Sequence, residues 1–118
     1  MRIFMIIAAI SGLLCVAIGA FGAHGVQEAR AKELVETGVR YQMFHTLALL
    51  ALAALVPGDA VARYAGIAFI AGAVLFSGSL YGMAFGAPRV LGAITPVGGL
   101  IFMIGWALAA FAFYRTRA

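Results

Sequence analysis

The sequence of 118 residues is 65% hydrophobic and only 10% charged, and its formal net charge is +4. Soluble globular domains contain about 45–50% apolar and about 25% charged residues, and a chain this short would need more polar side chains to cover a surface in water. These proportions exclude a soluble domain and indicate an integral membrane protein, and the scattered basic residues do not form the patch of a nucleic-acid-binding protein.

Four apolar segments follow one another along the chain, at about 3–22, 41–57, 63–85 and 91–114, with charged residues only at their ends and between them. Each has the roughly 17–25 residues that a helix needs to cross a hydrocarbon core of about 30 Å. Backbone groups in lipid must be paired within the segment, which favours helices. The sequence therefore predicts an all-α fold with a single domain over 1–118: a compact, integral membrane four-helix bundle.

The only substantial polar stretch lies between the first two segments, at about 26–40. Glu28 with Lys32, and Glu36 with Arg40, are four residues apart with the acid first, an order that favours a helix. We expect an amphipathic helical segment here, which either lies along the membrane interface or continues directly into the second span.

Small residues recur on one face of three of the predicted spans, where they allow helix backbones to approach closely. We interpret these faces as packing surfaces within the chain, although a homo-oligomer would use the same kind of surface. The residues are Gly12, Cys15, Gly19 and Gly22, then Gly78, Gly82 and Gly86, then Gly98, Gly105 and Ala109.

An even number of spans places both termini on one side of the membrane. Lys and Arg residues then number four on each side: Arg2, Arg63, Arg115 and Arg117 with the termini, and Arg30, Lys32, Arg40 and Arg89 opposite. The terminal arginines lie close to the ends of their spans, which slightly favours termini in the cytoplasm.

Uncharged polar side chains gather near the membrane side that is opposite to the termini, at the end of the first and third spans and the start of the second and fourth. This polar layer at one leaflet is our candidate binding site. Its members are His24, Tyr41, Gln42, His45, Ser77, Ser79, Tyr81 and Thr95.

The two histidines in this layer suggest a metal or haem site, or a proton relay. Two histidines with no Cys, Asp or Glu beside them in the membrane are a weak metal signal, so we favour a structural role and expect no cofactor. Catalysis is also not indicated. A serine at 77 or 79 could pair with His45 as a nucleophile, but no acid is placed to orient the histidine.

Four motifs resemble those of the YgdD/YwdK-type family of small bacterial membrane proteins, also known as domain of unknown function 423. They are GAFGAHG at 19–25, ETGVRYQMFH at 36–45, LFSGSLY at 75–81 and TPVGG at 95–99. The family has relatives among small mitochondrial membrane proteins of animals. The resemblance implies a multi-pass protein of the bacterial cytoplasmic (inner) membrane without an established activity, and it supplies no catalytic residues.

Three hypotheses for function follow. The first is a non-enzymatic accessory component that binds membrane lipids or a protein partner through the polar layer. The second is a small transport or channel element that works as an oligomer, and the third is a bis-histidine haem or metal protein.

Overall fold

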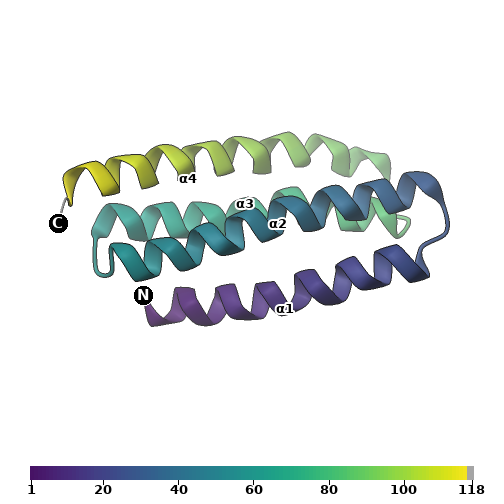
Figure 1. Ribbon diagram of the computed structural model, residues 1–118. Helices are drawn as coiled ribbons and strands as arrows, with labels where there is room; N and C mark the ends of the chain where they lie inside the picture. The colour runs from purple at the N-terminus through teal and green to yellow at the C-terminus, as the bar shows by residue number, and fades with distance from the viewer. Residues whose placement is uncertain (117–118) are drawn as a thin grey trace.

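A computed structural model describes residues 1–116 and consists of helices joined by short connections (Figure 1). The elements are α1 (Arg2–Gly25), α2 (Ala29–Leu55), α3 (Ala60–Ala84), the short 3-10 helix η1 (Arg89–Ala93) and α4 (Thr95–Arg115). The predicted all-α architecture with four long helices is confirmed, and the described residues contain no strand.

The helices run antiparallel, and each packs most extensively against its neighbour in the chain: α1 on α2, α2 on α3, and α3 on α4. The molecule measures 49 × 26 × 17 Å, so it is flatter than the compact bundle that the sequence suggested. α2 and α3 form the centre, with α1 and α4 on opposite sides of this pair, and both chain ends lie at the same end of the molecule (Figure 1).

Three helical segments are long and apolar enough to cross a membrane: α1, α3, and residues 89–115, which comprise η1 and α4. Their outward side chains include Leu13, Val74 and Met103, which are 70%, 66% and 67% exposed. Large apolar side chains in such positions would be costly in water and are natural against lipid. The exposed surface thus supports the multi-pass membrane fold.

α2 is one continuous helix whose first half carries the charges predicted for the amphipathic segment. The two expected acid–base pairs are not formed. Glu28 instead caps the helix, since its carboxylate accepts from the Ala31 amide at 2.9 Å, and Lys32 Nζ donates to the Ala23 carbonyl at 3.3 Å. Of the two predicted arrangements, the direct continuation of the amphipathic segment into the second long helix is therefore the one observed, although α2 is not among the three segments whose length and composition suffice to cross a membrane.

The connection between α2 and α3 is a tight turn in which Gly58 has a φ of 81°. Asp59 follows and caps α3 by accepting from the Ala62 amide at 2.8 Å. It also pairs with Arg115 at the end of α4, at 2.9 Å. The hydrogen bond from Ala62, together with the charge and hydrogen bond of Arg115, lowers the pKa of the Asp59 carboxyl below its ordinary value.

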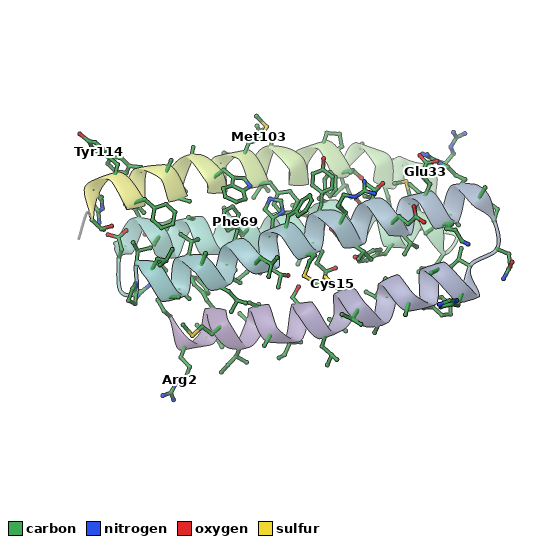
Figure 2. The ribbon with its side chains drawn as sticks, viewed as in Figure 1. Arg2, Cys15, Glu33, Phe69, Met103 and Tyr114 are labelled. Carbon is green, nitrogen blue, oxygen red and sulfur yellow. The ribbon has the colours of Figure 1, made fainter. Side chains whose placement is uncertain are left out.

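Small residues on α1 and α4 lie in helix contacts within the chain, as predicted, whereas the face predicted on α3 is not one, because no atom lies within 4 Å of a Cβ placed at Gly78 or Gly86. A Cβ at Gly22 would overlap Val35 of α2, one at Gly98 would overlap the backbone of Phe76 on α3, and one at Gly105 would overlap the ring of Phe69. In Figure 2, Phe69 lies in the middle of the structure, whereas Arg2 and Tyr114 lie at the end that holds the termini and Glu33 at the other end.

Candidate functional site

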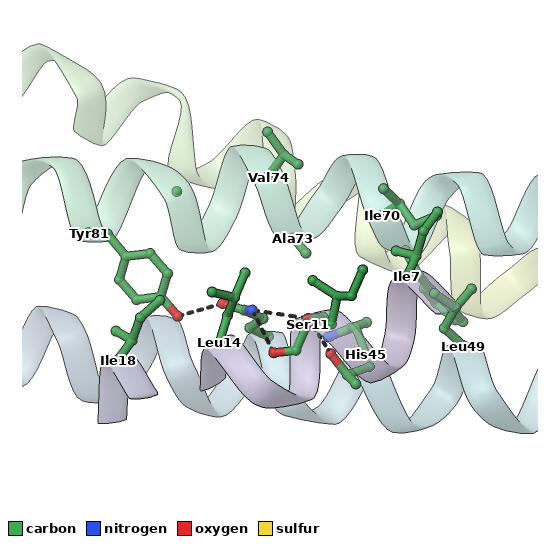
Figure 3. Close-up of a pocket in the computed structure, with 15 residues that line it drawn as sticks. Ile7, Ser11, Leu14, Ile18, His45, Leu49, Ile70, Ala73, Val74 and Tyr81 are labelled. Atoms are coloured by element: carbon green, nitrogen blue, oxygen red, sulfur yellow. Dashed lines mark hydrogen bonds between the residues drawn. The ribbon is translucent and has the colours of Figure 1, made fainter. Parts of the chain in front are cut away.

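Gln42 of α2 connects three helices through its side-chain amide. Its Nε2 donates to the carbonyl oxygen of Ser11 at 3.3 Å and to the Ser11 hydroxyl at 3.0 Å, both on α1. Its Oε1 accepts from the Tyr81 hydroxyl of α3 at 2.7 Å. Figure 3 shows these bonds in the space between α1 and α3. A buried amide that is satisfied from both sides fixes α1 and α3 against α2.

Other hydroxyl groups extend this network along the helices. The Ser11 hydroxyl lies 2.7 Å from that of Thr46, and Ser77 donates to the Gly38 carbonyl at 2.7 Å. Ser79 donates to the Phe76 carbonyl at 2.9 Å and also contacts the hydroxyl of Thr95. Every buried side-chain polar atom of the described residues has a hydrogen-bond partner. The buried polar side chains of these helices are therefore satisfied by bonds within the protein.

His45 is held with both ring nitrogens engaged. The indole Nε1 of Trp106 donates to His45 Nε2 at 3.0 Å, so this nitrogen must be unprotonated. The proton is then on Nδ1, which donates to the carbonyl oxygen of Tyr41 at 2.6 Å. The imidazole also stacks on the Phe102 ring, with centroids 3.5 Å apart. His45 is thus a neutral link between α2 and α4 with no nitrogen left for a metal.

A first groove lies between α1 and α3, with α2 as its floor (Figure 3). It has a volume of about 440 Å³, within the range of about 300–1,000 Å³ typical of small-molecule sites. Gln42 and Thr46 lie on its floor, and its walls are formed by apolar side chains such as Leu14 and Val74. We call it the α1–α3 groove.

A second groove lies on the opposite side, between α2 and α4, with a volume of about 880 Å³. Aromatic side chains dominate its lining. They are Tyr41 and Phe44 of α2, Phe76 of α3, and Phe102 and Trp106 of α4. His45 lines both grooves, so the two hollows lie back to back across the central helix pair. We call this one the α2–α4 groove.

The structure brings together seven of the eight predicted site residues, either in the network or beside it. His24 is the exception, because it is exposed in the last turn of α1. His45 lies 16 residues beyond the start of α2 at Ala29, or about 24 Å along the helix. The structure therefore contradicts a bis-histidine haem or metal site, and no group of three or more metal-binding side chains occurs among the described residues.

The network is also deeper than a layer at one leaflet. It reaches Ser11 and Trp106, near the midpoints of α1 and α4. The hypothetical pairing of a serine with His45 is not formed either, since Ser77 donates to Gly38 and both nitrogens of His45 have other partners. The arrangement organises helices and contains no nucleophile–base pair among the described residues.

Sequence reasoning missed three members of the network: Ser11, Thr46 and Trp106. Ser11 is the only hydroxyl-bearing residue in the apolar run of α1, which was the available signal. Thr46 is likewise a hydroxyl in an apolar run, and Trp106 is the single tryptophan, but their partners depend on how the helices are rotated about their axes.

Comparison with known proteins places the chain among uncharacterised membrane proteins. Residues 18–99 match the model of a family described as "Protein of unknown function (DUF423)". The chain is 48% identical over 112 residues to the UPF0382 inner membrane protein YgdD of Escherichia coli K12, covering 91% of this chain and 86% of that protein. It is 43% identical to a UPF0382 membrane protein of Haemophilus influenzae, over 98% of this chain and 96% of that protein.

A further relative is the UPF0382 membrane protein YwdK of Bacillus subtilis, which is 44% identical over 90% of this chain and 91% of that protein. No solved structure matches the chain.

Proposed function

Because the chain belongs to the DUF423 family of membrane proteins, whose function is unknown, we propose its role from the geometry of its grooves. The protein is a non-enzymatic membrane component that holds an apolar chain from the bilayer in the α1–α3 groove. The observation that carries this proposal is a hollow of about 440 Å³ that is walled by apolar side chains and closed underneath by a satisfied polar network.

Lipid chains are the natural occupants of such a groove. An empty apolar hollow forfeits dispersion contacts on its open side, and a flexible acyl chain restores them. The polar atoms of the floor are already paired, so they neither demand a polar ligand nor provide a reactive group. This favours a binding role over catalysis, and it favours an apolar chain over a polar solute.

A photoreactive benzoyl-phenylalanine probe tests the occupant. We would place it at Val74, which is 66% exposed and lines the groove, and at Leu13, which is 70% exposed on the same bundle but outside the groove. We expect a defined lipid adduct at Val74 and only weak, heterogeneous adducts at Leu13. Equal adducts at both positions would refute the groove as a site, and a protein adduct at Val74 would replace the lipid by the helix of a partner.

The second hypothesis from the sequence is a transport or channel element, and no observation in the structure favours this function. His45, which lines both grooves, is engaged at both ring nitrogens. Vesicles reconstituted with the protein are expected to show no flux of protons or small ions above the protein-free control.

For the orientation, we propose that both termini face the cytoplasm. The support is that Arg2 and Arg115 lie at the helix ends beside the termini, where basic residues favour the cytoplasmic side. Fusions at the C-terminus test this: green fluorescent protein should fluoresce and alkaline phosphatase should be inactive. The reverse pattern would place the termini outside.

A further inference from the structure

A charged stripe on α2 leads directly into the α2–α4 groove. Positions 33, 36, 40, 44 and 47 follow the spacing of one helix face, and all five side chains are exposed. The outer part of this stripe carries Glu33, Glu36 and Arg40, and the inner part carries Phe44 and Leu47, which line the groove. The charges therefore stand at the mouth of an apolar hollow on the same face.

Arg40 lies at the depth where the hydrocarbon layer should begin. Its neighbour Tyr41 has its ring centroid 4.6 Å from that of Phe76, and Gly98 in the first turn of α4 packs directly against Phe76. Arg40 is therefore level with the first turn of α4, and the other charges of α2 lie on the outer side of that level. Tyr41 beside it, 39% exposed, has the amphipathic ring that favours the headgroup boundary.

The charges on the stripe are ordered along the membrane normal. Arg40 is next to the apolar half of α2, and Glu36 lies one helical turn, or about 6 Å, farther out. The ion pairs among the described residues are Arg30 with Glu33 and Arg115 with Asp59, so neither Arg40 nor Glu36 is engaged in one. A cation lies at the inner position and an anion at the outer one.

We propose that the α2–α4 groove and this pair of charges form a site for one phospholipid of the phosphatidylethanolamine type. Such a lipid carries its phosphate next to the glycerol and its primary ammonium farther out, which is the order that complements Arg40 and Glu36. Its acyl chain lies on the aromatic lining of the groove, whose volume is about 880 Å³. The site is separate from the α1–α3 groove, and it does not depend on what that groove holds.

Headgroup selectivity is the consequence that distinguishes this site from general contact with lipid. Phosphatidylglycerol has the phosphate but no ammonium, so it satisfies Arg40 and leaves Glu36 facing an anionic lipid. Phosphatidylcholine has a cation without N–H donors, so it cannot hydrogen-bond the Glu36 carboxylate. We expect phosphatidylethanolamine to bind more tightly than either.

Native mass spectrometry of the full chain, delipidated in detergent and mixed with one lipid at a time, tests the proposal. Arg40→Gln should reduce the one-lipid adduct with phosphatidylethanolamine by about threefold or more, the scale of a partly exposed ion pair. Glu36→Gln should reduce the phosphatidylethanolamine adduct but not the phosphatidylglycerol adduct. Arg63→Gln is the control, since Arg63 is an exposed arginine that lines neither groove and lies outside the ion pairs of the described residues, and it should change neither adduct.

A second variant tests the groove without touching the charges. Gly99→Leu would fill the lining, because a Cβ at Gly99 makes ordinary contacts with the Phe76 ring at 3.8 Å, and it should lower the same adduct while helical circular dichroism is retained. Equal binding of the three lipids by the unmodified protein, or an unchanged adduct in Arg40→Gln, would overturn the proposal. Neither result affects the Val74 cross-linking that tests the α1–α3 groove.

Discussion

Replacing Gln42 with Leu is the sharpest test of how this bundle is held together. The substitution keeps a side chain of similar size but removes the donor to Ser11 on α1 and the acceptor of Tyr81 on α3. Interhelical hydrogen bonds in membranes contribute about 0.6 kcal/mol each on average, so the two links together contribute about 1.2 kcal/mol. The stranded hydroxyl of the half-buried Tyr81 adds about 1 kcal/mol, since a donor that loses its partner inside the bundle is costly. We expect the free energy of unfolding to fall by about 2 kcal/mol.

Equilibrium unfolding in mixed micelles of sodium dodecyl sulfate measures this change. Trp106, the only tryptophan, reports on the transition because its indole donates to His45 within the bundle. The matched control is Gln27→Leu, which changes an exposed glutamine in the connection between α1 and α2 and should alter the free energy by less than about 0.5 kcal/mol.

A double-mutant cycle with Tyr81→Phe isolates the hydrogen bond between Tyr81 and Gln42. Removing both partners leaves no stranded donor, so the double variant should be less destabilised than the sum of the single variants by about 1 kcal/mol. Single-variant effects that add to within about 0.3 kcal/mol would refute the reasoning, because the two side chains would then be energetically independent.

Two further predictions concern the contacts of α4. Gly98→Ala should destabilise the fold by about 1–3 kcal/mol in the same assay, because the new methyl group overlaps the backbone of Phe76 and must push α4 away from α3. Gly99→Ala is the neutral control, since its methyl group meets the Phe76 ring at 3.8 Å. Equal losses of stability in both variants would contradict the packing argument. Asp59 has a lowered pKa, so its contribution to stability is complete above the ordinary carboxyl pKa of about 4 and is lost as the pH falls through the lowered value. The free energy of unfolding, measured from pH 6 to pH 2, should show this loss. The variant Asp59→Asn should lack that part of the pH dependence. Identical pH dependence of stability in the unmodified protein and in the variant would exclude a role for the Asp59–Arg115 pair.

The helices of this protein could be predicted from sequence largely because lipid imposes a simple rule. Uninterrupted apolar runs correctly located α1, α3 and α4, each to within a few residues. The second apolar run was placed at 41–57 and a helical amphipathic segment at 26–40, and the structure joins the two in one helix that begins at Ala29. Charges at 29–40 mark the boundary of the hydrocarbon, and a helix can cross that boundary without ending.

The candidate site was predictable only in part, for a different physical reason. Gln42 and Tyr81 were recognisable as polar side chains in apolar surroundings, and the structure joins them. Their partner Ser11 could not be assigned, because the choice depends on the rotation and depth of α1 against α2. His24, like His45, is a histidine near charged residues in the sequence. In the structure it is exposed in the last turn of α1 and lies outside the network.

The packing of each helix on the one before it has a consequence for biosynthesis. An α-helical protein in which the first and last helices make few contacts with each other has no long-range pairing to wait for, and such local topologies assemble quickly. As the chain leaves the ribosome, α2 finds α1 already inserted, α3 then adds to α2, and α4 closes onto α3. The first hairpin can already pair Ser11 with Gln42 and Thr46, whereas Gln42 Oε1 gains its partner Tyr81 only with α3, and Trp106 of α4 completes the pairing of His45 last.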